Sequence, residues 1–105
     1  IDPDQQDKEG RTPLSWAAEY GRTEVAKTPL SDGRVDPERQ DDFGRTPLSW
    51  AAKNGHMGVA KTLLCDGRVD PDRQGNEGWT PLSWAARSGR TEAVKTLCHL
   101  MAELS

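Results

Sequence analysis

The sequence predicts an all-α fold, an α-solenoid of three helix-turn-helix repeats joined by hairpin loops in a single elongated domain. Two repeated words and the helix boundaries inside each repeat support this prediction. The heptapeptide TPLSWAA begins at Thr12 and returns letter for letter at Thr46 and Thr80, an interval of 34 residues each time. The word GRVDP occurs at Gly33 and again at Gly67, with the same interval. A fixed period between about 20 and 50 residues is typical of stacked units, none of which buries its apolar face alone.

The first helix of each unit is bounded by residues that favour helix ends. Thr12 is a good N-cap, Pro13 suits the first helical position, where its missing N–H is no loss, and Gly21 is a typical C-terminal stop. Ser15 lies three residues after Thr12, where its hydroxyl can reach back to the cap. We therefore expect first helices at residues 13–20, 47–54 and 81–88.

A second helix should begin near Thr23 in the first unit. Its apolar stripe is clearest in the middle copy, which has Val59, Ala60, Leu63 and Leu64. Residues 33–45 are rich in Asp, Gly and Pro, a composition that favours an extended hairpin or loop between units. The expected repeats are 7–40, 41–74 and 75–105, and residues 1–6 are expected to be the tail of a preceding repeat.

Two departures from the period predict changes in helix length. Pro29 stands where later copies have Leu63 and Leu97, inside a second helix. That helix should be kinked or shortened there, and the first repeat should be the least stable, because an interior proline removes a backbone hydrogen bond. In the last repeat the Asp-Gly-Arg turn gives way to a continuing apolar stripe, so the final helix should lengthen over the preceding one; the stripe is Leu97, Leu100, Met101 and Leu104.

Several of these features together resemble the ankyrin repeat. They are a period near 33 residues, a TPLxxAA opening, a glycine between two short helices and an Asp-x-x-Gly-x-Thr hairpin tip, which reads DKEGRT at 7–12 and DDFGRT at 41–46. The resemblance covers essentially the whole chain. Ankyrin repeats usually have a histidine where this chain has Ser15, Ser49 and Ser83, so a shorter hydroxyl must replace or forgo its bond to the capping threonine. The Ser-Trp variant is similar to the ankyrin arrays of fungal NACHT-type signalling proteins.

The resemblance implies a non-catalytic module for protein–protein interaction. In ankyrin arrays the hairpin tips and first helices line a concave face that binds the partner. The matching positions of this sequence are Arg11, Trp16, Tyr20, Phe43, Arg45, Trp50, Asn54, Trp79, Trp84 and Ser88. Aromatic and arginine side chains suit this role because they dominate interface hot spots. The alternative is a structural spacer or capping segment of a longer array, with no partner of its own.

Two roles are open for the tryptophans of the heptapeptide. On a helical wheel Trp16 points away from Leu14 and Ala18. The rings can pack against neighbouring units, or they can form a partly exposed ladder that offers ring faces and indole N–H groups to a partner. Phe43 and Trp79 have a structural alternative too, in which they cover neighbouring hairpins.

Composition and charge argue against several other classes. The net charge is −3, from 14 basic and 17 acidic residues, and the basic residues are spread along the chain, so nucleic acid is not the expected partner. No apolar run approaches the roughly 20 residues of a membrane span. Cys65 and Cys98 are too few for a disulfide framework and lie in apolar helical patterns, so we expect reduced thiols and an intracellular, cytoplasmic location. We also expect a monomer.

The sequence contains no convincing catalytic or metal-binding pattern. The repeated serines lie outside a Gly-x-Ser-x-Gly elbow, and His56 and His99 do not share their period. Cys98 and His99 are adjacent in a predicted helix, which directs them about 100° apart and makes a poor zinc site. The carboxylates at 66–72 lack the spacing of a calcium loop. We therefore expect no enzymatic activity, no metal and no cofactor.

Overall fold

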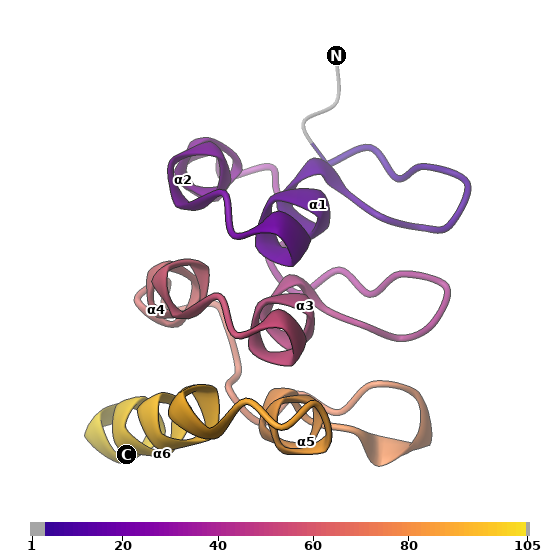
Figure 1. Ribbon diagram of the computed structural model, residues 1–105. Helices are drawn as coiled ribbons and strands as arrows, with labels where there is room; N and C mark the ends of the chain where they lie inside the picture. The colour runs from indigo at the N-terminus through magenta and orange to yellow at the C-terminus, as the bar shows by residue number, and fades with distance from the viewer. Residues whose placement is uncertain (1–3, 105) are drawn as a thin grey trace.

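The chain folds into helix pairs stacked in three layers (Figure 1). The computed structural model describes residues 4–104, apart from the side chains of Glu77 and Leu104. Within these residues the first helices are α1 (Pro13–Tyr20), α3 (Pro47–Asn54) and α5 (Pro81–Arg87), the second helices are α2 (Thr23–Ser31), α4 (Met57–Leu64) and α6 (Thr91–Leu104), and no strand occurs. A 3₁₀ turn, η1 (Asn76–Gly78), lies in the third hairpin. The predicted all-α solenoid of three repeats is confirmed; of the tail expected at 1–6, residues 1–3 lie outside the described part.

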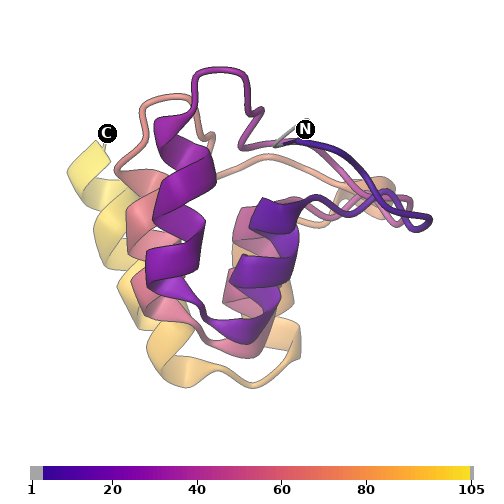
Figure 2. The same ribbon diagram turned by 90° about the horizontal axis from the view of Figure 1, so that it is seen from above.

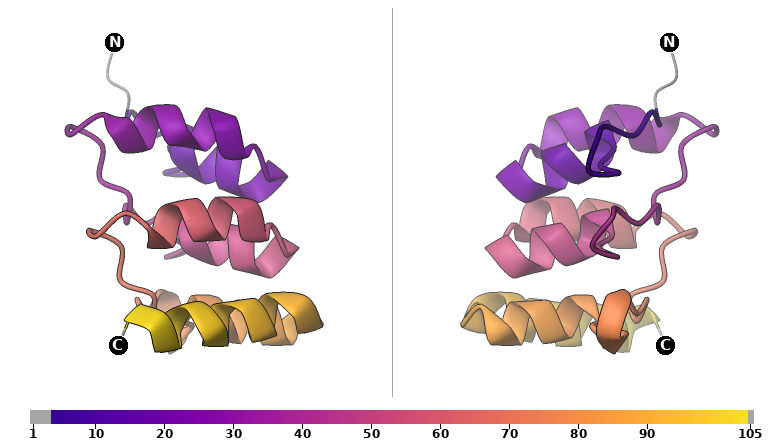
Figure 3. Two further views of the ribbon diagram at one scale, coloured as in Figure 1. Left: turned by 90° about the vertical axis from the view of Figure 1, so that its left-hand side faces the viewer. Right: turned by 90° about the vertical axis from the view of Figure 1, so that its right-hand side faces the viewer.

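The first helices form one row, the second helices form another, and the hairpins project from the first row (Figures 1 and 2). Side views show the three layers following one another at similar spacing (Figure 3). The domain measures 38 × 26 × 22 Å, so it is only modestly elongated. Packed helices are spaced by about 8–10 Å, so the height of three stacked layers is little more than the width of one layer with its hairpin.

The expected caps form at the first helices. Thr12 Oγ1 accepts the N–H of Ser15 (3.2 Å), and Ser15 Oγ accepts the N–H of Thr12 (3.0 Å). Thr46 and Ser49 make the same pair of bonds in the second repeat, at 3.3 and 2.8 Å. The serine hydroxyl therefore replaces the histidine that most ankyrin repeats have at this position, through a reciprocal capping box. Gly21 ends α1 in the left-handed conformation, with φ of 70°.

The core lies between the two rows of helices. Its first two layers each combine one leucine of the first helix with a pair of alanines, which allow neighbouring helices to approach closely. The stripe predicted for the second helix is buried in α4. The buried apolar residues are Leu14, Ala17, Ala18, Ala26, Val35, Leu48, Trp50, Ala51, Ala52, Val59, Ala60, Leu63, Leu64, Val69, Ala85, Ala93 and Leu97.

Pro29 does not shorten the helix that contains it. Helix α2 runs through Pro29 to Ser31 and has nine residues, against eight in α4. Of the two outcomes expected at Pro29, the shortening was therefore wrong, and the kink stays a prediction. The physical reason is position: Pro29 lies in the last turn, where Leu30 and Ser31 are the two helical residues that follow it, so the lost hydrogen bond to the carbonyl of Val25 affects little of the helix. The lower stability of the first repeat stays a prediction.

The last helix is longer than the other second helices, as predicted. Helix α6 has 14 residues and continues past His99. Leu97 is buried, Leu100 packs against the core, and Met101 is half-buried. The side chain of Leu104, the last member of the predicted stripe, lies outside the described residues.

Hydrogen bonds between hairpins hold the layers in register. The side-chain amide of Gln6 donates to the carbonyl of Gln40 (3.4 Å), and Gln40 donates to that of Gln74 (3.2 Å). The N–H of Asp42 donates to the carbonyl of Glu9 (2.9 Å). Because each hairpin lies on the one before it, residues 34 positions apart become neighbours on one face.

Candidate functional site

An aspartate at each of the first two hairpins holds both the turn and a tryptophan. Asp7 Oδ1 accepts the N–H of Arg11 (3.0 Å), and Asp7 Oδ2 accepts the indole N–H of Trp16 (2.9 Å). The Arg11 N–H, and then the Trp16 indole, lower the pKa of the Asp7 carboxyl. One repeat later, Asp41 Oδ2 accepts the indole N–H of Trp50 (3.0 Å). The hairpin therefore fixes the orientation of the ring in repeats 1 and 2.

Arginines and tryptophans alternate between the layers, in the order Trp16, Arg11, Trp50, Arg45 and Trp84, which we term the Arg–Trp stack. The guanidinium carbon of Arg11 lies 3.7 Å from the ring centroid of Trp16 and 4.1 Å from that of Trp50. Arg45 lies 4.6 Å from the centroids of both Trp50 and Trp84. Such cation–π contacts stabilise by about 0.5–2 kcal/mol each. The central ring is thus part of the seam between repeats.

The charge beside each stacked arginine changes along the array. Arg11 forms an ion pair with Glu19. Lys53 occupies the matching position beside Arg45, with its ammonium 5.3 Å from the ring centroid of Trp50. Burial, and then the charge of Arg45, lower the pKa of Lys53. Arg45 therefore has a cation where Arg11 has a carboxylate.

The third repeat departs from the pattern at two more positions. Gly75 stands where the first two hairpins have aspartate, and the indole N–H of Trp84 has no hydrogen bond among the described residues. Trp79 stands where they have arginine, and its ring lies 4.9 Å from that of Trp84, with the planes tilted by 34°. The guanidinium of Arg87, at the register of Lys53, lies 5.1 Å from the ring centroid of Trp79. The Arg–Trp stack therefore ends in two rings with a further cation.

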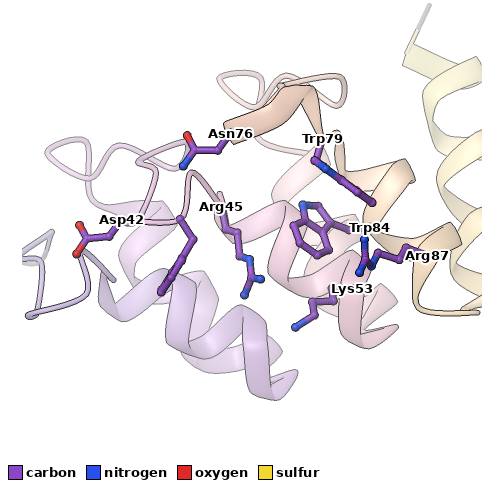
Figure 4. A pocket seen from close by; sticks show the side chains of 8 residues that line it. Asp42, Arg45, Lys53, Asn76, Trp79, Trp84 and Arg87 are labelled. Atoms are coloured by element: carbon purple, nitrogen blue, oxygen red, sulfur yellow. The ribbon is translucent and has the colours of Figure 1, made fainter.

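These departures surround a cleft of about 490 Å³ between the last two hairpins and helices α3 and α5 (Figure 4). Three cations, Arg45, Lys53 and Arg87, lie around the ring of Trp84. No ion pair joins any of them to a carboxylate in the part of the chain that the structure describes. The Nε of Arg45 is buried without a hydrogen-bond partner. The lining residues are Asp42, Phe43, Arg45, Lys53, Asn76, Trp79, Trp84 and Arg87.

The carboxylate of Asp42 is directed away from these cations. A Cβ atom placed on Gly10 would lie 2.6 Å from Asp42 Oδ1, so this oxygen packs against the first hairpin. Figure 4 accordingly shows Asp42 at the far end of the cleft from Arg87. The cleft is therefore cationic and aromatic on its helical side.

Comparison with known families supports the repeat assignment. A family model described as ankyrin repeats in three copies matches residues 28–105, and a single ankyrin-repeat model matches residues 9–42. The chain belongs to the ankyrin repeat family. No curated protein matches the chain. Ankyrin repeats are generally non-catalytic modules that bind other proteins.

The exposed members of the expected ankyrin binding face come from all three repeats. Tyr20 is 59% exposed and stacks parallel to Trp16, which is 36% exposed, with 6.0 Å between ring centroids. Phe43 is 55% exposed at the tip of the second hairpin. Ser88 is exposed at the end of α5, which stops one residue earlier than expected.

The other expected contact residues are partly or wholly covered. Arg45, Trp79 and Trp84 are half-buried in the cleft. Arg11 and Trp50 are buried within the Arg–Trp stack, which leaves little of their surface for a partner. Asn54 is the last of the expected contact residues, and its side-chain amide donates a hydrogen bond to the carbonyl of Glu19 in the preceding repeat (3.1 Å). A contact between any of these residues and a partner stays a prediction.

Sequence reasoning missed Lys53 and Arg87. The signal was the residue directly after each TPLSWAA word, which changes from Glu19 to Lys53 to Arg87 while the seven residues before it stay constant. Only the stacking of the layers shows that this position lies beside the arginine of the same repeat.

The structure places the cysteines differently from the sequence-based expectation. Cys65 and Cys98 are both free and exposed, and Cys65 lies just beyond the end of α4 rather than inside its apolar stripe. Across residues 4–104, no three His, Cys, Asp or Glu side chains are arranged to hold a metal ion. None of the described helices has the length and apolar character needed to cross a membrane.

Proposed function

We propose that this ankyrin domain binds a protein partner through the concave face formed by its hairpin tips and first helices. The supporting observation is the exposed ring of Phe43 beside the cleft of Arg45, Trp79 and Trp84. A ring that is more than half exposed adds little to the packing of its own chain. Aromatic and arginine side chains gathered in one hollow are typical of interface hot spots.

The alternative role, a spacer within a longer array, is favoured by a different observation. Trp16, Tyr20 and Val25 leave an exposed apolar patch on the first layer. The matching ring of Trp50 is covered by Arg11 from the layer before it. Another repeat stacked on the first layer would cover Trp16 in the same way, as in a spacer with no partner of its own.

We further propose that the domain is an intracellular, cytoplasmic monomer whose partner is a protein rather than nucleic acid or a membrane. Many of its arginines are paired with carboxylates of the same chain, as in Arg34–Asp32, Arg68–Asp66 and Arg73–Glu38. They do not form the continuous basic track that a nucleic-acid backbone requires.

The test compares partner capture by the wild-type domain and three variants. A partner captured by the wild-type domain is identified, and its affinity is measured for Phe43→Ala, for Phe43→Ala with Trp79→Ala, and for Val25→Ala. Val25 is equally exposed but lies on α2, away from the cleft. The double variant should bind at least about 30-fold more weakly, the loss typical of a hot-spot truncation of about 2 kcal/mol. Phe43→Ala alone should account for part of this loss with an unchanged thermal midpoint, and Val25→Ala should have no effect.

Unchanged affinity of the double variant together with a lowered thermal midpoint would show that these rings are structural. The interface would then lie on another face of the domain.

A further inference from the structure

We propose that the cleft between the second and third repeats binds an acidic segment of the partner. One carboxylate of that segment would lie among Arg45, Lys53 and Arg87, and its apolar part would lie against the rings of Trp79 and Trp84. This inference rests on the proposed protein-binding function and specifies the chemistry of the partner.

The first repeat shows the same arrangement with its carboxylate in place. Arg11 contacts two tryptophan rings and forms an ion pair with Glu19. Arg45 also contacts two tryptophan rings, but the residue at the matching position is Lys53. A carboxylate from a partner would supply the anion that Glu19 supplies in the first repeat.

The cleft also contains hydrogen-bond donors without an acceptor. The Nε of Arg45 is buried without a hydrogen-bond partner, as is the Nε of Arg11, but Arg11 has the ion pair with Glu19 and Arg45 has none within residues 4–104. The indoles of Trp16 and Trp50 donate to aspartates, whereas Gly75 leaves the indole of Trp84 without a carboxylate acceptor. Charge-assisted hydrogen bonds to a carboxylate would satisfy such donors, and bidentate recognition is the typical role of arginine at carboxylate sites.

Lys53 is disfavoured as a cation in the unbound protein. Burial, and then the charge of Arg45, lower the pKa of Lys53, and the charge of Glu19 offsets only part of this effect. A bound carboxylate would remove part of this repulsion. Binding should therefore raise the pKa of Lys53 and weaken with added salt, since exposed charges are screened.

An acidic peptide fits the cleft better than a chain of phosphates. The cations lie around one hollow of about 490 Å³, which has room for one or two side chains. Arginines outside the cleft, such as Arg73, are paired with carboxylates of the same chain. A protein with a net charge of −3 attracts a long polyanion weakly, so a local carboxylate contact is favoured.

The test uses fluorescein-labelled hexaglutamate as the probe and hexaglutamine as its uncharged control. Binding is followed by fluorescence polarisation and by the indole N–H signals in ¹H–¹⁵N spectra, in low salt of about 50 mM, where screening is weak. Hexaglutamate should shift the signals of Trp79 and Trp84 and leave those of Trp16 and Trp50, which are bonded to Asp7 and Asp41, in place. Hexaglutamine should shift none of them.

The decisive variant is Lys53→Glu, which recreates the pairing of the first repeat. Because Arg11 and Glu19 already pack in this way, the variant should fold with an unchanged or raised thermal midpoint. Its affinity for hexaglutamate should fall at least about tenfold, equivalent to 1.4 kcal/mol. Lys61→Glu, the same charge change at an exposed site on α4, should alter the affinity by less than about threefold, since distant surface charges are largely screened.

Three results would overturn the inference. The first is that the Trp84 signal does not shift at hexaglutamate concentrations up to about 5 mM, which corresponds to negligible affinity. The second is that Lys53→Glu and Lys61→Glu change the affinity for hexaglutamate equally. The third is that hexathymidylate binds more tightly than hexaglutamate. A partner captured in a manner that depends on Phe43, combined with no hexaglutamate binding, would leave the proposed function standing and refute only the acidic site. Specific hexaglutamate binding, combined with partner capture that is unchanged in the Phe43 variants, would refute the proposed interface at Phe43 and leave the acidic site standing.

Discussion

Replacing the same tryptophan by alanine in successive repeats should produce unequal losses of stability. Trp50 is 7% exposed, whereas Trp16 is 36% exposed. A tryptophan buries about 200 Å², so Trp50 hides about 60 Å² more than Trp16, which corresponds to about 1.5 kcal/mol. The ring of Trp50 also contacts the guanidinium groups of both Arg11 and Arg45, whereas in the described part of the chain Arg11 provides the one guanidinium over the ring of Trp16, and the additional cation–π contact adds about 0.5–1 kcal/mol.

Trp50→Ala should therefore destabilise the domain by about 2 kcal/mol more than Trp16→Ala. Its total loss should lie near the 3–5 kcal/mol found for buried Trp→Ala substitutions. Urea unfolding followed by circular dichroism measures both losses. In thermal unfolding, the difference should amount to about 8 °C or more for a domain of this size.

Leucines at one register provide the control for position along the array. Leu14 and Leu48 are both 1% exposed, two residues before Trp16 and Trp50. Leu14→Ala and Leu48→Ala should each cost about 2–5 kcal/mol. The reasoning is refuted if the two tryptophan variants differ no more than the two leucine variants do, because the difference would then come from the place of the repeat and not from the surroundings of the ring.

Two further substitutions test the departures from the repeat. Pro29→Leu should raise the free energy of unfolding by about 1–3 kcal/mol, because it restores a backbone donor to the carbonyl of Val25. Hydrogen exchange at 25–30 should then slow toward that at 59–64, and an unchanged exchange rate would contradict the argument. Gly75→Asp restores the residue of the other two hairpins, yet it should destabilise the domain, since its Cβ would lie 2.2 Å from the Gly44 carbonyl oxygen. Gly33→Asp, where nothing lies within 4 Å, is the control in the same unfolding assay, and equal stabilities of the two variants would refute the steric argument.

The fold could be predicted from the sequence because its determinants are local. The Thr-Pro and Gly boundaries of α1 and α3 lie within one turn of the backbone groups that they cap, and both helices match their expected bounds. The expected shortening at Pro29 was wrong because a general rule for interior proline was applied to a last turn, where two helical residues follow the proline. The continuation of α6 was predictable because an i, i+3, i+4, i+7 stripe is itself a local pattern.

The candidate site was only partly predictable, because its properties depend on the neighbouring layers. Trp16 and Trp50 occur in identical heptapeptides, but one is at an open end and the other lies between two guanidinium groups. No reading of a single repeat distinguishes them. The roles of Lys53 and Arg87 follow only from the distances of their charges to rings in the stack.

The differences between the repeats are therefore more informative about function than the repeats themselves. Gly75 removes the acceptor of an indole, Trp79 removes the cation that would continue the stack, and Lys53 places a positive charge where a carboxylate would neutralise Arg45. Each change weakens an interaction that an earlier repeat makes. Sequence features that conflict with local stability are expected at functional sites. Because all three changes lie at or beside one cleft, their shared location supports the proposal that the cleft is shaped for a ligand. A carboxylate would compensate two of them, as an acceptor for the indole of Trp84 and as the anion beside Arg45 and Lys53.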